Sequence, residues 1–414
     1  MTTTPSAPPQ TRSKSRRPLA LIGLATLLIG TGFLTWRSTT LQDIPEIADP
    51  FDLAAFAKIE VRDEDNAFIP FREAVGRYKA SEHANATDWA TATASDRRWL
   101  EENREALAIW RRGAERPDAL FARPSEASLE TSYDVVQILR LFVRLACLEA
   151  SRLAAAGDQA GAWGWYRAAL RSGRLCGRNG GLIERMIGVA MTATASKAVT
   201  AWASTPQVDA SSLRGALADV QGLDALTMAT SFTLVADSLA FSNSTERPDL
   251  LRKAMGGAML DEKGSAWSEW SAPKVAIYRI NATLRREPER SRRVLRLILA
   301  NWLPYCDLPA DRRPPLTPAH QLVFVTGPES PPDARLLDPK RMDAAMRSTV
   351  LLRHYYPAYH TTLGVVDRDR IVRANLIVHL ASELYTRERG KPPATPEALV
   401  GPYLIELPPT FNQK

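Results

Sequence analysis

The sequence predicts an all-α protein, in which an N-terminal transmembrane helix precedes an irregular helical bundle. Three observations support this prediction. An uncharged apolar run, 18–36, lies between Arg17 and Arg37. Over most of the remaining chain, apolar residues recur at three- and four-residue steps, which is the spacing of one face of an α-helix. Only one segment, 321–326, has the pattern of a β-strand.

Residues 18–36 are predicted to form the transmembrane helix. These 19 residues would reach about 28 Å as a helix, close to the thickness of the hydrocarbon core of a bilayer. A cleaved signal peptide is the alternative. We favour a retained signal-anchor because the residues just behind the run, 34–37, are bulky and charged and show no small-x-small cleavage pattern.

The charges that flank this run predict its orientation. Four basic residues precede it, and no acidic residue occurs before Asp43. Because short basic flanks stay in the cytoplasm, we expect residues 1–17 to be a disordered cytoplasmic tail. Residues 37–58 would then be a juxtamembrane linker, and the bulk of the chain would lie in the periplasm, anchored in the inner membrane of a bacterium.

Residues 59–303 are assigned to a helical bundle domain. Its strongest pattern is at 131–156, where apolar residues leave only a narrow polar stripe, as in a helix at the centre of a bundle. One helix is expected to begin near Phe68, and another is expected within 87–113, with Ser95 or Asp96 as its N-cap. Further helices are expected at 159–175, 182–203, 210–221, 223–241, 247–260, 273–285 and 289–303.

The last quarter of the chain begins with a stretch that is unsuited to a regular helix. Residues 304–340 hold nine prolines, and each proline removes a backbone donor, so we assign them to an extended excursion or a linker. Residues 341–414 form a C-terminal helical segment, with a helix near 341–353, a loop through Gly364 and a long helix at 369–389 that Gly390 ends. A short helix should follow Thr395 and end at Gly401. Whether the body is one domain or two is left open.

Composition argues against several functions. Hydrophobic residues make up 45% and charged residues 24% of the chain, as in a globular protein with a buried core. The net charge is +7, but four basic residues belong to the N-terminal tail, and the remaining excess of about +3 is too small to indicate nucleic acid. Cys147, Cys176 and Cys306 are interpreted as buried free thiols, and their spacing predicts neither a disulfide framework nor a metal site. We expect no cofactor.

One dense polar and aromatic cluster is the best candidate for catalysis. Residues 354–360 contain His354, His360 and three tyrosines, and Asp367 and Asp369 follow. Two histidines and a carboxylate can hold a metal ion, but Pro357 interrupts the helical spacing, so local packing is the favoured interpretation. His379 is expected to be a satisfied, half-buried side chain. No motif of a known hydrolase, kinase or nucleotide-binding site is found.

A basic cluster at the start of the helix 289–303 is a candidate for contact with lipid headgroups. It comprises Arg285, Arg286, Arg290, Arg292 and Arg293, offset by two glutamates. In a protein tethered to a bilayer such arginines can bind anionic lipids. The alternative, which we favour, is the charged and solvated start of a core helix.

The segment around Gly157 resembles one tetratricopeptide repeat. Gly157 and Asp158 make a turn between two helices, and Ala162, Tyr166 and Ala169 follow the small, large, small pattern of the second helix. The first helix and the closing proline depart from the pattern, and no second copy follows. The resemblance implies a helical hairpin over about 34 residues, and we favour a generic hairpin over a repeat.

The C-terminal stretch 383–408 resembles the tail of the major pseudopilins of type II secretion. It also resembles a tail found on uncharacterised membrane-anchored bacterial helical proteins, which share the anchor, an acidic segment such as 63–68 and a helical middle. Residues 409–411, Pro-Thr-Phe, stand where that pattern has Asp-Pro-aromatic. The acidic calcium loop of a pseudopilin is missing, and so is the prepilin cleavage pattern. The resemblance implies no activity.

Three hypotheses follow from these observations. The first is an extracytoplasmic structural or interaction protein with a protein partner in the cell envelope. The second is a cell-envelope hydrolase that uses the region from His354 to Asp369. The third is an accessory of a secretion or pilus-like assembly. The sequence favours the first.

Overall fold

A computed structural model describes residues 26–35, 41, 44–81, 85–128, 134–245, 286–313, 344–345, 349, 352 and 359–409. Every regular element in these residues is a helix, so the all-α prediction is confirmed. Extended pairing in the described part consists of two isolated bridges, Asn66 with Asp118 and Val400 with Leu404. The predicted strand 321–326 and the predicted helices 247–260 and 273–285 lie outside the described residues.

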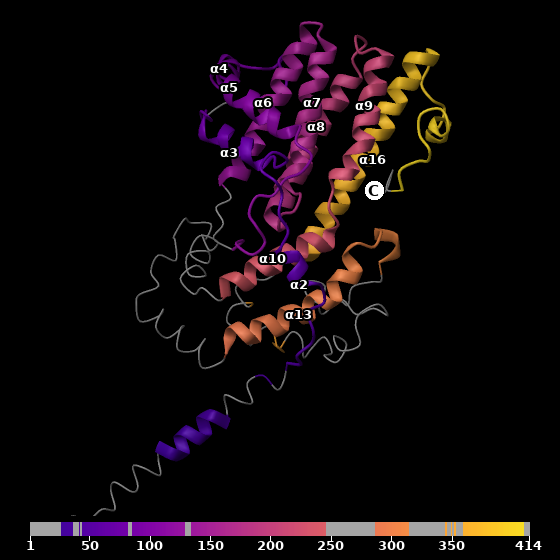
Figure 1. Cartoon of the computed structure of the whole chain (residues 1–414). Helices are drawn as coiled ribbons and strands as arrows, with labels where there is room; N and C mark the ends of the chain where they lie inside the picture. Colours follow the sequence, from indigo (N-terminus) through magenta and orange to yellow (C-terminus); the bar gives the residue numbers. More distant parts are fainter. Residues whose placement is uncertain are drawn as a thin grey trace, which may run out of the picture.

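In chain order the elements are α2 (Leu53–Ala57), α3 (Phe68–Gly76), α4 (Ala94–Glu102), α5 (Arg104–Ala114), α6 (Asp134–Ala155), α7 (Gln159–Cys176), α8 (Leu182–Ala203), α9 (Ala210–Gly222), the 3₁₀ helix η1 (Leu223–Leu226), α10 (Thr230–Thr245), α13 (Glu287–Cys306), the 3₁₀ helix η2 (Ala310–Arg312), α16 (Tyr359–Arg389) and the 3₁₀ helix η5 (Pro396–Leu399). Helices α6, α7, α8 and α9 run alternately up and down beside one another (Figure 1).

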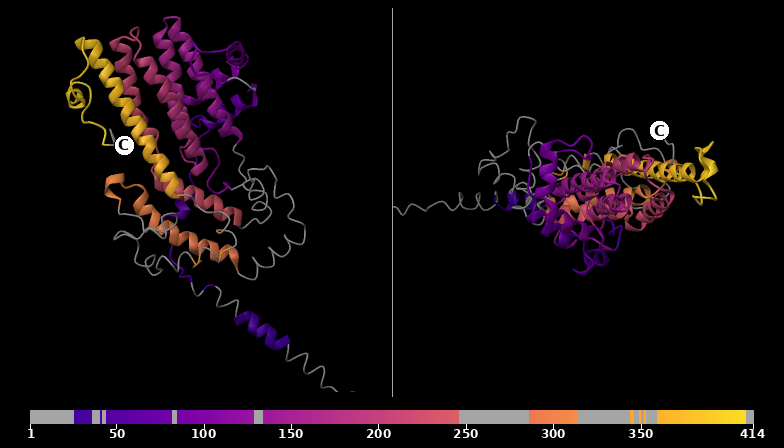
Figure 2. Two further views of the ribbon diagram at one scale, coloured as in Figure 1. Left: turned by 180° about the vertical axis from the view of Figure 1, so that it is seen from behind. Right: turned by 90° about the horizontal axis from the view of Figure 1, so that it is seen from above.

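The larger part, which we call the bundle, comprises α3 to α9, α16 and the tail that follows α16. Helices α6, α7 and α8 pack in sequence, and the long helix α16 lies beside α8 and α9 (Figures 1 and 2). Aromatic rings fill the core between α3, α5 and α6. Trp110 stacks between Phe71 and Phe142, whose ring centroids lie 6.5 and 6.1 Å from that of Trp110. The bundle buries one continuous hydrophobic cluster.

Glycines bring α7 and α8 into close contact. A Cβ atom added at Gly188 would lie 2.3 Å from the carbonyl oxygen of Gly173, and one at Gly173 would lie 2.5 Å from the Thr192 hydroxyl. Only residues without a side chain allow this backbone approach. The small residues that the sequence shows in α8 therefore set the spacing of these two helices.

The smaller part, which we call the α10–α13 unit, comprises α10, α13 and the segment 44–51. Helices α10 and α13 lie side by side below the bundle in Figure 1, and they enclose a second hydrophobic cluster around Phe241, Ile298 and Trp302. Ile44 and Ile47 of the segment 44–51 are buried in this cluster. The middle of the predicted juxtamembrane linker is therefore packed along α13, because its isoleucines cover apolar surface of that helix.

Part of the predicted transmembrane run is described. The helix Thr26–Thr35 is apolar, and its side chains are exposed, with Leu27 and Ile29 at 64% and 73%. Residues 18–25 and 36 lie outside the described residues. Among the described residues, no single helix is both long enough and apolar enough to cross a bilayer. One pair of helices, Ala210–Leu226 and Thr230–Ser244, has the required length and apolar character when the two are taken together, but the pair is bent by 44°.

Several predicted boundaries are wrong. The helix expected within 87–113 is two helices, because the Asn103 side chain bonds the backbone of Lys79 and the carbonyl of Trp99 and so ends α4. The N-cap of α4 is Thr93, where Ser95 or Asp96 was predicted. The Thr93 hydroxyl accepts a hydrogen bond from the Asp96 N–H, and the Asp96 carboxylate accepts one from the Thr93 N–H.

Three later boundaries also differ from the sequence prediction. The helix predicted at 223–241 is split into η1 and α10 by an extended residue, Thr227. Helix α13 continues through Pro304 to Cys306, because Trp302 and Tyr305 pack in the second cluster. Helix α16 already includes Gly364, where a loop was expected, since Leu363 and Val366 are buried. Gly390 and Gly401 end their elements as predicted, with φ of +70° and +93°.

Candidate functional site

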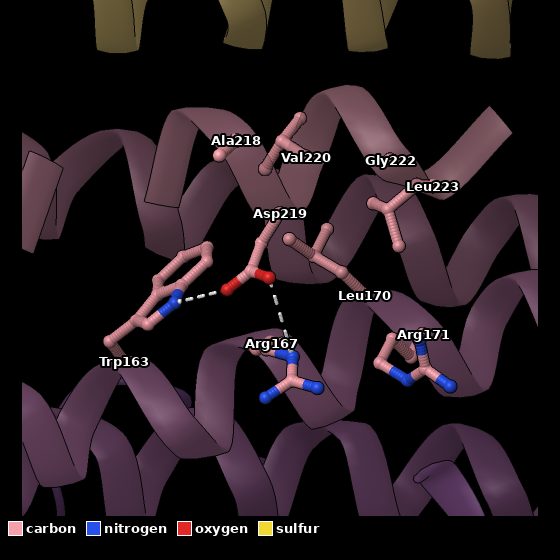
Figure 3. Close-up of a pocket in the computed structure, with 9 residues that line it drawn as sticks. All are labelled: Trp163, Arg167, Leu170, Arg171, Ala218, Asp219, Val220, Gly222 and Leu223. Atoms are coloured by element: carbon pink, nitrogen blue, oxygen red, sulfur yellow. Dashed lines mark hydrogen bonds and ion pairs between the residues drawn. The ribbon is translucent and has the colours of Figure 1, made fainter. Parts of the chain in front are cut away.

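A groove lies between α7 and α9 on the surface of the bundle (Figure 3). Its volume is about 150 Å³. Helix α7 supplies one side through residues spaced by a helical turn, and α9 with η1 supplies the other. The groove is lined by Trp163, Arg167, Leu170, Arg171, Ala218, Asp219, Val220, Gly222 and Leu223.

The floor of the groove is apolar and one wall is rigid. Leu170, Val220 and Leu223 are buried beneath the opening. Trp163 forms the wall: its ring stacks on Trp202 with centroids 5.4 Å apart, and its indole N–H donates to the Asp219 carboxylate at 2.9 Å. Because Trp202 holds the ring and Asp219 holds the indole N–H, the Trp163 side chain is ordered before any ligand binds.

Charged groups surround this apolar floor. The Arg167 guanidinium lies 3.7 Å from the Asp219 carboxylate and donates to Glu115 at 2.9 Å. Arg171 donates to the carbonyls of Ala114 and Arg116 at 2.7 and 3.0 Å and so caps the end of α5. Burial lowers the pKa of Arg171 from its ordinary value, but an arginine remains a cation at neutral pH.

This arrangement is suited to binding. An apolar cavity of about 150 Å³ holds a ring the size of benzene, so the groove has room for one large side chain or a small aromatic group. None of the lining residues is a nucleophile next to a base, and both Asp219 oxygens already face donors.

The arginines predicted to contact lipid headgroups make internal contacts in part. Arg290 is buried. Arg293 donates to Glu46 at 2.7 Å, to the Ile44 carbonyl at 3.3 Å and to Glu289 at 3.0 Å.

The remaining members of this cluster differ in exposure. Arg292 is half-buried and lies 3.6 Å from Glu289, whereas Arg286 is exposed at the start of α13. Arg285 lies outside the described residues. Headgroup contact stays a prediction, with Arg286 as its exposed member.

The predicted histidine cluster falls largely outside the described residues, which exclude His354 and the side chain of His360. Its two carboxylates are described, and they diverge. Asp367 pairs with Arg313, with a second contact at 3.0 Å, whereas Asp369 forms an ion pair with Arg174 in the interior. Since both acids are held by arginines on different elements, the described part of this region does not bring them together in one cleft.

Charged groups are buried where α7, α8 and α16 meet. The Arg174 and Asp369 side chains are each only 4% exposed. Arg185 is buried nearby, and burial, reinforced by the positive charge of Arg174, lowers its pKa to about 10. This cluster joins α16 to α7 and α8.

A second buried carboxyl lies at the start of α8. Glu184 lines a small cavity with Asp237 of α10, and its Oε2 atom has no hydrogen-bond partner in the structure. Burial raises the pKa of Glu184 to about 7, against the hydrogen bonds from the backbone of Gly181 and Glu184.

The three cysteines and His379 do not form a shared site in the described residues. Cys147, Cys176 and Cys306 are free and buried, as predicted, and burial raises the pKa of Cys147 to about 12. The His379 ring is half-buried, with Nε2 3.1 Å from the Ser204 hydroxyl and 3.2 Å from the Thr200 carbonyl. Within the described residues, no group of three or more histidine, cysteine and acidic side chains is arranged to hold a metal ion.

The sequence prediction missed the groove. Trp163, Arg167 and Arg171 recur at four-residue steps on α7, and this mixed aromatic and basic stripe was a signal. Its partner residue, Asp219, is 56 positions further along, and only the packing of α9 against α7 identifies it.

Comparison of the chain with protein families, with curated proteins and with solved structures finds no match.

Proposed function

We propose that this chain is a single-pass protein of the bacterial inner membrane whose helical body acts as an interaction element on the periplasmic side. Residues 18–36 form its signal-anchor, and the N-terminus lies in the cytoplasm. The apolar run and its basic flank support this topology.

The observation that carries the proposal is the docking of the segment 44–51 on α13. Ile44 and Ile47 are buried, Arg293 binds Glu46, and the Arg296 guanidinium lies 2.6 Å from Asp49. The seven residues between the run and this segment, 37–43, span at most about 25 Å. A retained anchor would therefore hold the α10–α13 unit close to the bilayer and would leave the bundle facing away from it.

Two resemblances fit this role. The α6–α7 pair is proposed to be a tetratricopeptide-like hairpin: Ala162 and Ala169 are fully buried, and Tyr166 packs on Trp202 of α8 with ring centroids 6.0 Å apart. The pseudopilin-like tail is proposed to be a stabilising module, since Leu399 and Leu404 join the core of the bundle. An accessory role in a secretion or pilus-like assembly would rest on this tail alone, and nothing in the site favours it.

Catalysis is not favoured by the geometry. The groove lacks an acid–base pair, and the described carboxylates of the alternative region, Asp367 and Asp369, are held by separate arginines. The composition of the groove, with aromatic and arginine side chains around an apolar floor, is instead typical of protein interfaces.

Topology is tested with reporters fused after the last residue. We expect alkaline phosphatase to be active and green fluorescent protein to be dark at this position, because the first folds only in an oxidising compartment. Fluorescence with inactive phosphatase would overturn the proposed location. Mass spectrometry of the purified protein should find residues 1–36 still attached; a mature chain that begins beyond Trp36 would replace the anchor by a cleaved signal peptide.

The interaction role is tested by chemical crosslinking in intact cells, followed by purification of the full chain. The proposal expects a reproducible crosslinked species. Repeated recovery of the full chain alone would count against an interaction role while leaving the topology intact.

A further inference from the structure

The groove between α7 and α9 continues into a basic surface on α5. Arg111 and Arg112 lie in the last turn of α5 and Arg116 lies just beyond it, and Arg167 and Arg171 of α7 bind this end of α5 through Glu115 and the carbonyls of Ala114 and Arg116. Arg111 is fixed over the ring of Trp165, 4.5 Å from its centroid. The surface therefore combines ordered guanidinium groups with the rigid Trp163 wall.

Positive charge exceeds negative charge on this surface. Glu115 and Asp219 are the acidic side chains within ion-pair distance of Arg167 and Arg171. In the part of the chain that the structure describes, Arg111, Arg112 and Arg116 have no carboxylate at that distance. The α5 end and the α7 side of the groove therefore carry five arginines and, with Asp219 of α9, two carboxylates, so the surface has a net positive charge and attracts acidic groups.

We infer that the groove binds an acidic segment of a partner protein, which inserts one large apolar or aromatic side chain between α7 and α9. This inference rests on the proposed function and names the chemistry of the partner. The volume of about 150 Å³ admits one such side chain, and the apolar floor stabilises it by removing it from water. The flanking carboxylates lie on the arginines of α7 and α5.

The position of Asp219 gives the bound segment a direction. Asp219 lies between Trp163 and Leu170 in Figure 3 and is held by the Trp163 N–H and by Arg167. Its negative charge repels carboxylates from the α9 side of the groove. Glu115 repels them in the same way beside Arg167 and Arg171. The acidic residues of the partner therefore lie toward Arg111, Arg112 and Arg116 of the α5 end, and a backbone N–H of the partner is the group best suited to approach Asp219.

Two glycines of α9 offer a blocking variant and its control. A Cβ atom added at Gly222 or at Gly215 meets no atom within 4 Å, so both positions accept a side chain without disturbing the core. Gly222 lines the groove, whereas Gly215 lies two helical turns away on the same face of α9 and outside it. Gly222→Trp should fill the mouth of the groove, and Gly215→Trp should leave it open.

The probes are fluorescent pentapeptides with two acidic residues on each side of a central Ala, Leu, Phe or Trp. A second set carries lysines in place of the acids. Binding to the full chain in detergent micelles is measured by fluorescence anisotropy at two salt concentrations. We expect the peptides with a central Leu, Phe or Trp to bind about tenfold more tightly than those with Ala, as partial burial of such a side chain in an open groove allows. The lysine peptides should not bind.

The variants then separate the two halves of the inference. Gly222→Trp should weaken binding about tenfold, by excluding the central side chain, and Gly215→Trp should not change it. Arg112→Gln combined with Arg167→Gln should weaken binding and flatten its salt dependence, because rim charges act through long-range attraction.

Four results would overturn the inference. The first three are no binding by any acidic peptide, equal binding with central Ala and Phe, and unchanged binding by Gly222→Trp. Equal displacement of the peptide by an oligonucleotide of the same charge would show recognition of negative charge alone, and would also overturn it. Each of these outcomes leaves the reporter and crosslinking results untouched, so a failure of the groove is distinguished from a failure of the proposed function.

Discussion

The bundle and the α10–α13 unit are both built from helices, but their contacts differ in sequence separation and in chemistry. The bundle joins α7 and α8, which are neighbours in the chain, through glycine contacts and the stacked rings of Trp163 and Trp202. The α10–α13 unit joins α13 to a segment about 250 positions earlier, through buried isoleucines and ion pairs such as Arg293 with Glu46. The first arrangement is a close-packed core, and the second is a clamp on the segment that leads to the predicted anchor.

The largest expected effect is overpacking between α7 and α8. Gly188→Val places a side chain 2.3 Å from the backbone of Gly173, and backbone cannot move aside as a flexible side chain does. We expect a loss of about 3 kcal/mol in the free energy of unfolding, measured by urea unfolding with tryptophan fluorescence. Gly215→Ala, where the added Cβ has open space, should be neutral or stabilising by up to about 1 kcal/mol. Equal effects of the two variants would refute the close-packed description.

Where the two parts meet, the buried Glu184 should make stability depend on pH. Burial raises its pKa to about 7 in the folded protein, whereas an unfolded glutamate titrates near about 4.3. The folded state therefore holds the proton more tightly, so this contribution is complete below pH about 4.3 and is lost as the pH rises to about 7. The loss is on the order of 3 kcal/mol.

Glu184→Gln removes the titrating group and keeps the shape. The variant should be more stable than the parent above pH about 7 and should lose the slope between pH about 4.3 and about 7. The free energy of unfolding measured across this range checks the prediction. A parent protein with no slope in this window, or a variant with the same slope, would contradict it.

Asp96 at the far end of the bundle should show the opposite dependence. Burial tends to raise its pKa, but hydrogen bonds from the Thr93 hydroxyl and from the backbone of Ala86, Thr93 and Asn85 lower it to about 2. Its contribution is present above pH about 4 and is lost as the pH falls to about 2. Asp96→Asn should cost about 2 kcal/mol at neutral pH. Glu102→Gln, at an exposed position of the same helix, is the control and should change stability little.

The smallest expected effect tests the clamp. Arg293→Ala removes the contacts to Glu46 and to the Ile44 carbonyl and should cost about 1 kcal/mol. The effect should be local, with faster amide hydrogen exchange in 44–51 and unchanged exchange in α7 and α8. Arg286→Asn is the matched control, since Asn tolerates the left-handed backbone at that position, where φ is +54°. Faster exchange throughout the bundle would show that the two parts unfold together.

The sequence by itself determined the all-α class and most elements of the bundle. Helix α8 begins and ends at the predicted residues, and α6 and α7 lie within a few residues of theirs. These elements were predictable because their apolar spacing, the Gly157 turn and the glycine stops at Gly390 and Gly401 are local signals. The exposed helix Thr26–Thr35 lies within the predicted anchor, whose role in a membrane remains a proposal.

Only the tertiary structure decided where distant polar groups meet. Nothing near Trp163 in the sequence indicates Asp219, and nothing near Ile44 indicates Arg293, because a contact between residues far apart in the chain leaves no periodic pattern. The same reason explains the break at Asn103, where a side chain satisfies the backbone of Lys79 in place of a helical bond. Helix formation follows the local spacing of apolar residues, whereas the groove and the clamp depend on which helices pack against each other.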